Sequence, residues 1–299
     1  MRIEILLYTT AISDHQFQRY VPSSFFHQRT LAHLGRIAIR TDPDDSLTMT
    51  IDLLHREAHV WFAIPESVQD DGILRRLQTI LSSEELDRYR RFHFPADRHR
   101  YLVSHALVRN TLSRYIDIPP ADWYFSHGEH GRPEIANPDI PPLRFNLTHT
   151  NGLVCCIVTL DDDCGIDAEK ITARHATPEI AKRMFSGAEY RELQRLEGQQ
   201  HLKYFFTRWT LREAYVKARG TGIFFPTHKL RFTIAADRSI AVSFDADIDN
   251  KKECWNFQLL SLSEAHITAI ALNEIQAADK IIVVRRLDFQ TALDQEQAK

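Results

Sequence analysis

Residues 153–169, LVCCIVTLDDDCGIDAE, predict two β-strands joined by a short acidic turn. The first strand, Leu153–Leu160, is apolar almost throughout, which is typical of a buried strand. The second, Gly165–Glu169, alternates, so that Asp167 and Glu169 share one face. Two carboxylates so placed repel each other unless a cation lies near them. A solvated edge strand would show the same pattern, so this motif alone only makes Asp167 and Glu169 candidates for metal binding.

A helical pattern follows over residues 201–219. Its apolar stripe, at 100° per residue, consists of Leu202, Phe206, Trp209 and Val216. Glu213 falls inside this stripe and Lys217 lies at its edge, whereas an ordinary surface ion pair would put both on the polar face. A carboxylate on the apolar side must be paired, protonated or bound to a metal, because an unpaired buried charge is costly. Glu213 is therefore the acidic residue that most clearly indicates chemistry.

Strand and helix patterns recur in both halves of the chain. Strands are expected at 60–64, 230–244, 255–272 and 281–284, and helices at 97–116, 177–185 and 187–195. A further helix begins at Ser82, with Glu85 at the capping-box spacing. This order predicts an α+β fold and is compatible with two related halves. We expect an N-terminal extension of uncertain structure at 1–57, an N-terminal lobe at 58–150 and a C-terminal lobe at 151–299.

Residues 88–100, RYRRFHFPADRHR, form a local basic cluster with five Arg and two His against one Asp. Arginine suits phosphate because its planar guanidinium binds two oxygens at once and stays charged. A solvated helical face with some RNA affinity would be equally compatible. Arg132 adds a positive group, and His149 is expected in a turn before the buried strand. Acidic metal ligands together with basic phosphate contacts suggest metal-assisted attack on a phosphate or pyrophosphate ester.

Composition excludes several classes of protein. The 299 residues contain 37 Lys and Arg against 40 Asp and Glu, a net charge of −3 that argues against a dedicated nucleic-acid binder. No apolar run approaches the roughly 18 residues of a membrane span, and no signal peptide is recognisable. The four cysteines show no zinc-binding spacing. We expect a cytoplasmic protein whose partners include neither nucleic acid nor a membrane.

Three segments together resemble the signatures of 4′-phosphopantetheinyl transferases, most closely the larger two-lobed type that activates peptide and polyketide synthetases. They are FNLTH at 145–149, GIDAE at 165–169 and WTLREAYVKA at 209–218. The similarity extends from about His59 to about Leu272. A D-x-E pattern alone is unspecific, but three motifs in the right order and spacing make a strong signal.

The resemblance implies a pseudo-dimer of two α+β lobes with coenzyme A bound at their junction. It implies transfer of the phosphopantetheine arm to a serine of an acyl or peptidyl carrier protein, with release of adenosine 3′,5′-bisphosphate. The implied Mg²⁺ ligands are Asp167, Glu169 and Glu213, and the implied catalytic residues are Glu213, Lys217 and Asp167. Glu213 would be the base and Lys217 would neutralise the leaving phosphate.

The resemblance also implies a set of coenzyme contacts. Arg100 and His149 would touch its phosphates, Arg132 would reach the 3′-phosphate, and the 127–132 turn would lie near the adenine. The full set of implied contacts is Arg100, Arg132, Asn146, Thr148, His149, Asp167 and Lys217.

The chain departs from the family pattern at several positions. Thr148 stands where Ser is frequent, Arg132 and Arg212 where Lys is frequent, and Glu85 where relatives are often basic. Two alternative functions stay open: another Mg²⁺-dependent enzyme that cleaves nucleotide pyrophosphates, or a non-catalytic module that binds through its Arg-rich segment. The two internal lobes make a monomer the simplest expectation.

Overall fold

The structure, a computed structural model, describes residues 37–39, 51–246, 248, 254–273 and 280–298. The elements of the first part are β1 (Ile37–Ile39), η2 (Ile51–His55), β2 (Glu57–Ala63), η3 (Pro65–Ser67), α2 (Asp71–Thr79), α3 (Ser83–Arg91), α4 (Pro95–Leu112), η4 (Pro120–Asp122), β3 (Phe125–His127), β4 (Pro133–Ile135), β5 (Leu143–Thr150) and β6 (Leu153–Leu160).

The elements of the second part are β7 (Asp163–Lys170), α5 (Pro178–Met184), α6 (Gly187–Leu193), α7 (Gly198–Arg219), η5 (Gly222–Phe224), η6 (Thr227–Lys229), β8 (Leu230–Ile234), β9 (Ile240–Phe244), β10 (Trp255–Leu260), β11 (His266–Asn273), β12 (Ile281–Arg286) and α8 (Phe289–Ala298). No helix among the described residues is both long and apolar enough to cross a membrane.

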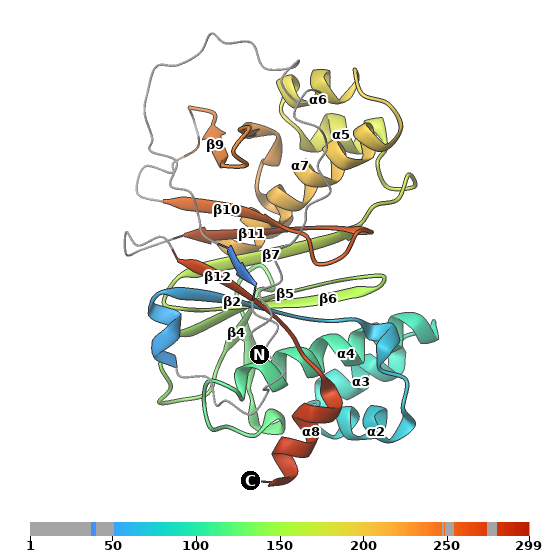
Figure 1. Cartoon of the computed structure of the whole chain (residues 1–299), viewed down its shortest axis with the longest axis vertical. Coiled ribbons are helices and arrows are strands. Elements are labelled where there is room, and N and C mark those ends of the chain that lie inside the picture. Colours follow the sequence, from blue (N-terminus) through green and yellow to red (C-terminus); the bar gives the residue numbers. More distant parts are fainter. Residues whose placement is uncertain (1–36, 40–50, 247, 249–253, 274–279, 299) are drawn as a thin grey trace, which may run out of the picture.

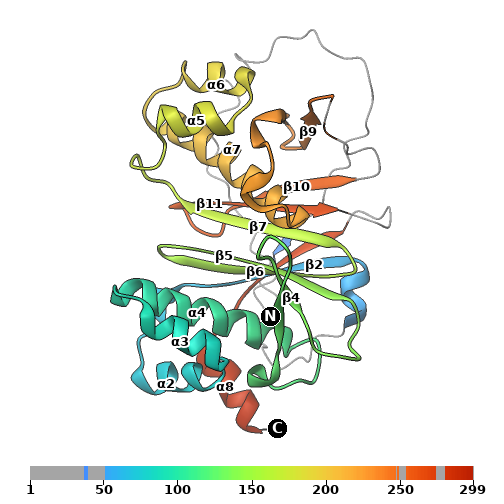
Figure 2. The ribbon, with the colours of Figure 1, turned by 180° about the vertical axis from the view of Figure 1, so that it is seen from behind.

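These elements stack in four layers, and the fold is α+β as expected (Figure 1). Two sheets lie face to face in the middle, with α2, α3, α4 and α8 on one outer side and α5, α6 and α7 on the other, an arrangement that the reverse view repeats (Figure 2). The larger sheet has the strand order β1-β12-β2-β6-β5, and the smaller has β10-β11-β7. Two hairpins, β3-β4 and β8-β9, complete the described strands.

The two sheets share an apolar core made from one face of each. Val60 and Ile157 contribute to it from the larger sheet, and Ile166 and Ile270 from the smaller. The opposite face of the larger sheet packs on α4 through Trp61, Val158 and their neighbours. Burial on both faces explains why β6 is apolar at nearly every position.

Strand pairing crosses the expected boundary between the lobes. Thr150 pairs with Leu153 in the β5–β6 hairpin, so the expected boundary at 150 and 151 falls inside the larger sheet. From the far end of the chain, β12 returns to this sheet and pairs in parallel with both β1 and β2. Leu293 of α8 then packs into the core beneath it. β12 and α8 therefore belong to the first half of the molecule, although they come from the end of the chain. The local sequence pattern of a strand does not specify such long-range pairing.

Most expected elements are confirmed, with two local differences. The strand Leu153–Leu160 and the capping box of Ser82 and Glu85 are both present. His149 was expected in a turn before the buried strand, yet it lies in the strand Leu143–Thr150, so that prediction is wrong. Helix α2, which the sequence analysis missed, is capped by Asp70. Residues 1–36 and 40–50 of the expected extension lie outside the described residues.

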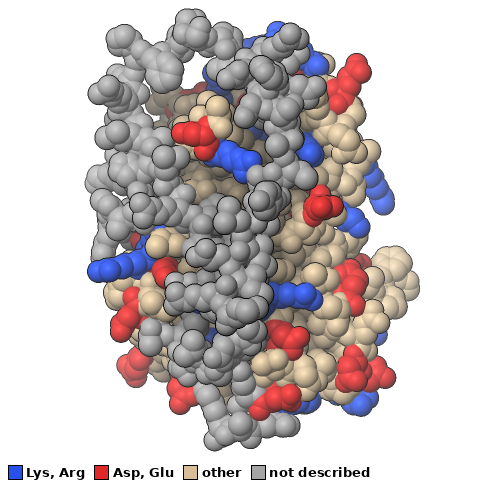
Figure 3. Space-filling model, viewed as in Figure 1, with Lys and Arg blue, Asp and Glu red and all other residues tan. Residues whose placement is uncertain are grey.

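Positive and negative side chains are mixed on one face of the molecule. On the face that Figure 3 shows, Lys and Arg side chains are interspersed with Asp and Glu rather than gathered in one patch. This matches the small net charge of the whole chain.

Candidate active site

The two sheets meet where the edge strand β5 runs beside the edge strand β7. Polar side chains at alternate positions of β5 bind backbone N–H groups at alternate positions of β7. Asn146 Oδ1 accepts from Ile166 N at 2.9 Å, Thr148 Oγ1 from Ala168 N at 3.2 Å, and Thr150 Oγ1 from Lys170 N at 3.4 Å. Because side chains on one face of a strand recur every second residue, these three bonds fix β7 in register with β5. Asn146 and Thr148, expected to contact the coenzyme, here connect the sheets.

Helix α7 brings Glu213 and Lys217 to the same place. Its backbone lies directly on β7: a Cβ atom added to Gly165 would be 2.0 Å from the carbonyl oxygen of Ala214. Lys217 Nζ donates to Asp167 Oδ1 at 2.7 Å and to the carbonyl of Ile166 at 3.2 Å. Close packing of helix on strand therefore turns two distant motifs into one side-chain cluster.

Asp167 lies at the centre of this cluster. Its Oδ1 accepts bonds from Lys217 and, at 3.3 Å, from Thr148 Oγ1. Its Oδ2 is buried and has no hydrogen-bond partner among the residues that the structure describes. A buried carboxylate oxygen without a donor is costly, so this atom is chemically suited to a cation.

Glu169 and Glu213 lie within electrostatic range of Asp167. Burial raises the pKa of Glu169 to about 7, and the charges of Asp167 and Glu213 add to the rise, while Lys217 and a hydrogen bond from Trp209 oppose it. Burial and Asp167 likewise raise the pKa of Glu213, against the opposing charge of Lys217. Three carboxylates around one ammonium thus leave an excess of negative charge.

The described side chains do not by themselves provide a complete set of metal ligands. In the described part of the chain, no three His, Cys, Asp or Glu side chains are arranged so that they could hold a metal ion by themselves. Mg²⁺, however, is usually held by one or two carboxylates, substrate phosphates and water. The orphaned Asp167 Oδ2 and the mutual repulsion of the carboxylates fit such an ion.

A group of basic side chains faces these carboxylates. Desolvation lowers the pKa of His149, and the positive charges of Arg100, Lys217 and His105 lower it further. Arg100 is bound to Asp97 on its own helix and to Asn151 in the β5–β6 turn. The structure therefore brings Arg100, His149 and Lys217 together, as the sequence analysis expected, and adds His105 to the group.

Arg132 is held by the protein itself. It is buried, donates to the carbonyl of Ala218 at the end of α7, and pairs with Glu134 and Asp163. It links the β3–β4 hairpin to α7 and β7.

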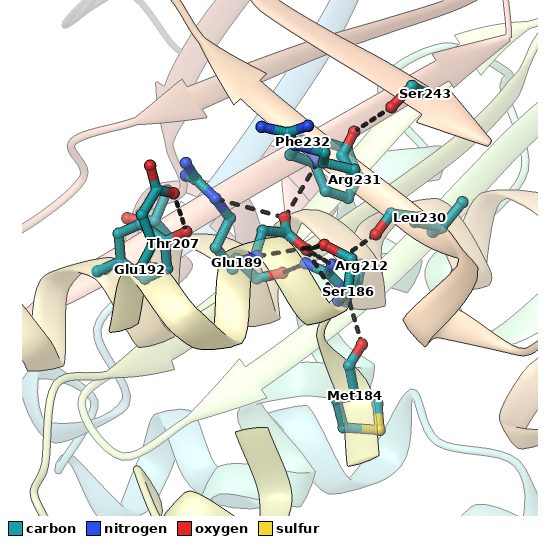
Figure 4. A network of polar contacts seen from close by, with 12 residues as sticks. Met184, Ser186, Glu189, Glu192, Thr207, Arg212, Leu230, Arg231, Phe232 and Ser243 are labelled. Carbon is teal, nitrogen blue, oxygen red and sulfur yellow. Dashed lines mark hydrogen bonds and ion pairs between the residues drawn. The ribbon is translucent and has the colours of Figure 1, made fainter. Parts of the chain in front are cut away.

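A buried network beneath α7 accounts for Arg212 (Figure 4). Its guanidinium pairs with Glu189 and also donates to the carbonyls of Met184 at 2.9 Å and Leu230 at 2.8 Å. Glu189 accepts from Phe232 N as well. Burial raises the pKa of Glu189, but Arg212 and these hydrogen bonds hold it below its usual range. This network fixes α5, α6 and β8 to the helix that carries Glu213.

The sequence analysis missed the partners of Glu85. Its carboxylate binds His105 Nδ1 at 2.8 Å and Arg109 Nε at 2.9 Å, both on α4. The spacing of His105 and Arg109, one helical turn apart, indicated only that the two side chains share a face of α4. It could not indicate that an acid from α3 lies against that face.

Models of two families match the chain. The model described as the 4′-phosphopantetheinyl transferase superfamily matches residues 163–271, and that described as 4′-phosphopantetheinyl transferase, N-terminal, matches residues 70–160. The chain is 36% identical over 174 residues to the 4′-phosphopantetheinyl transferase HetI of Nostoc sp., which covers 58% of this chain and 73% of that protein.

Two further relatives are similar over comparable lengths. The 4′-phosphopantetheinyl transferase Sfp of Bacillus subtilis is 31% identical over 180 residues, covering 60% of this chain and 77% of that protein. A phosphopantetheinyl transferase of Thraustochytrium sp. is 30% identical over 221 residues, or 70% of this chain and 75% of that protein. A holo-(acyl-carrier-protein) synthase structure from Bacillus anthracis aligns with a TM-score of 0.33 at 19% identity, over 38% of this chain and 96% of that one.

Proposed function

Because the chain belongs to the 4′-phosphopantetheinyl transferase superfamily, we propose that the junction of β5, β7 and α7 is its active site, with Asp167, Glu169 and Glu213 as the ligands of Mg²⁺. The enzyme transfers the 4′-phosphopantetheine arm from coenzyme A to a serine of a carrier protein. The observation that carries the assignment of the site is the unpartnered, buried Oδ2 of Asp167 beside Lys217.

The metal proposal follows from the donor set. The carboxylates of the cluster supply hard oxygen ligands, which would hold the ion together with the coenzyme phosphates and water rather than as a closed protein site. Asp167 contributes a buried oxygen that has no hydrogen-bond donor among the described residues. Bound Mg²⁺ would neutralise the coenzyme pyrophosphate and polarise the phosphorus that is attacked. Lys217, whose ammonium contacts Asp167, is positioned to stabilise the negative charge that develops on the leaving phosphate.

Glu213 is the proposed general base. Its carboxylate lies within electrostatic range of Asp167 and Lys217, so a proton that it accepts is taken up beside the proposed metal and phosphate site. It takes the proton of the carrier serine as the serine oxygen bonds to the phosphorus next to the pantetheine. The bond from that phosphorus to the bridging oxygen breaks, and adenosine 3′,5′-bisphosphate leaves.

The coenzyme phosphates are proposed to bind the basic side of the junction. Arg100 and His149 lie there, on α4 and β5, opposite the acidic residues of β7 and α7. Asn146 and Thr148 would support coenzyme binding indirectly, because they hold β7 in place. Arg132 would do so by joining the β3–β4 hairpin to α7.

We propose that the acceptor is an acyl or peptidyl carrier protein and that the enzyme acts as a monomer in the cytoplasm. All four cysteines are free, and three of them are buried, as in proteins of reducing compartments. The two lobes supply both sides of the site within one chain.

Intact-protein mass spectrometry tests the function. Purified enzyme is incubated with coenzyme A, Mg²⁺ and apo acyl and peptidyl carrier proteins, each beside a variant whose acceptor serine is replaced by alanine. We expect a mass increase equal to the phosphopantetheine arm on at least one serine-containing carrier and on none of the alanine variants. Cleavage of coenzyme A without any carrier would instead indicate a pyrophosphate-cleaving hydrolase.

A further inference from the structure

Glu85 connects the start of α3 to the middle of α4. One of its oxygens accepts from the backbone N–H of Ser82 and from Arg109 Nε, and the other lies 2.8 Å from His105 Nδ1. Burial alone would raise its pKa, but His105 and Arg109 lower it to about 2. The carboxylate is therefore charged at every pH at which the enzyme would work.

This contact leaves His105 with one open nitrogen. Ionised Glu85 can only accept hydrogen bonds, so the Nδ1 of His105 carries the proton that joins them. The ring is also fixed by Tyr101, with centroids 4.0 Å apart. Its Nε2 makes no hydrogen bond to any residue that the structure describes, and 26% of the side chain is exposed. His105 is thus an oriented imidazole with a free polar atom at the protein surface.

His105 lies near the basic side of the active site. It is on the same helix as Arg100 and within electrostatic range of His149. Protonation of Nε2 would allow His105 to donate a hydrogen bond to an anion. The carboxylate of Glu85, which contacts Nδ1, would balance the positive charge of the protonated ring.

We propose that His105 binds a phosphate group of coenzyme A through Nε2, and that Glu85 is the positioning residue that orients it. The proposal rests on the proposed function, since it takes coenzyme A as the ligand. Glu85 is an acid at a position where relatives are often basic. In this protein the imidazole of His105, on α4, would supply the positive charge, and the carboxylate of Glu85, on α3, would hold that ring in place.

Calorimetric titration of the whole enzyme with coenzyme A in the presence of Mg²⁺ tests the proposal. We expect H105Q to raise the dissociation constant about tenfold, the effect of losing one charge-assisted hydrogen bond. The matched control is H99Q on the same helix, whose imidazole binds the carbonyl of Pro65 instead; it should bind as the wild type does. Equal affinities for H105Q and H99Q would overturn the proposal.

Two additions sharpen this test. Repeating the titration with dephospho-coenzyme A identifies the phosphate: an affinity loss for coenzyme A alone points to the 3′-phosphate, and a loss for both ligands points to the pyrophosphate. In a double-mutant cycle, E85Q introduced into the wild type should weaken coenzyme A binding, whereas E85Q introduced into H105Q should cause little further loss of affinity. Fully additive effects would remove Glu85 from the positioning role.

Turnover separates this proposal from the proposed function. With a carrier protein as acceptor, H105Q should raise the KM for coenzyme A and leave kcat within about twofold. Normal transfer by H105Q at an unchanged KM would reject the role of His105 and leave the transferase function intact. Absence of transfer by the wild type, with the expected affinity loss in H105Q, would reject the function alone.

Discussion

Thr148 and Asp167 are joined side chain to side chain across the edges of the two sheets, with Thr148 Oγ1 3.3 Å from Asp167 Oδ1. The same hydroxyl accepts from the backbone N–H of Ala168. The hydroxyl oxygen of Thr148 thus contacts both the backbone of β7 and the carboxylate of Asp167. A conservative change at Thr148 should therefore alter the rate of transfer.

T148V should reduce transfer at least about tenfold and cost about 1–3 kcal/mol of stability, because it leaves a buried N–H and a carboxylate each short of a partner. T148S keeps the hydroxyl and should retain nearly full kcat. Steady-state kinetics and thermal melting of the two variants measure this. Wild-type turnover in T148V would show that the hydroxyl does not orient Asp167.

G165A should prevent normal packing of α7 on β7. The added Cβ would lie 2.0 Å from the carbonyl of Ala214, a contact that only a shift of the helix backbone can relieve. We expect a loss of about 3 kcal/mol or more, measured by chemical denaturation. G187A is the matched control, because its Cβ would meet only the flexible end of Arg191 at 3.4 Å. Similar stability of the two variants would contradict the close approach.

R212M should destabilise the protein by about 3 kcal/mol, since it removes the shorter of the two ion pairs of buried Glu189 and leaves only the longer one, to Arg208. The double variant R212M/E189M removes both charges and should recover part of this loss. Unfolding free energies of wild type, single and double variants give the coupling. If the loss of unfolding free energy in R212M/E189M equals the sum of the losses in R212M and E189M, the two side chains act independently.

E85Q should lose a pH-dependent part of the stability. The pKa of Glu85 is lowered to about 2 in the folded state, so its contribution is present in full above the unfolded value and is lost as pH falls toward 2. The stability difference between wild type and E85Q, on the order of 3 kcal/mol at pH 7, should shrink between about pH 5 and pH 3. Denaturation curves at several pH values measure it, and a difference independent of pH would contradict the ionised pair.

The sequence predicted elements and motifs better than their long-range partners. Helical spacing placed Glu213 and Lys217 one turn apart, and strand alternation placed Asp167 and Glu169 on one face; both depend only on local geometry. The resemblance to phosphopantetheinyl transferases is confirmed by the family models and relatives. Membership in that family replaces the alternative of a non-catalytic binding module.

Other features depend on contacts between distant segments. Nothing in the pattern of β12 indicates that it inserts between β1 and β2. The resemblance implied coenzyme contacts for Asn146 and Thr148, and no local pattern indicated that both side chains also bind the backbone of β7. Likewise, Arg132 finds its carbonyl partner 86 residues away.

Transfer rate as a function of Mg²⁺ concentration, in wild type and D167N, tests the central claim most directly. We expect no transfer in excess chelator, full recovery on adding Mg²⁺, and a D167N curve displaced to much higher Mg²⁺ with a lower plateau. A matched control, D161N, changes an exposed acid in the turn that precedes the same strand and should titrate like the wild type. Transfer that persists in chelator, or superimposable curves for D167N and wild type, would contradict a metal site at Asp167.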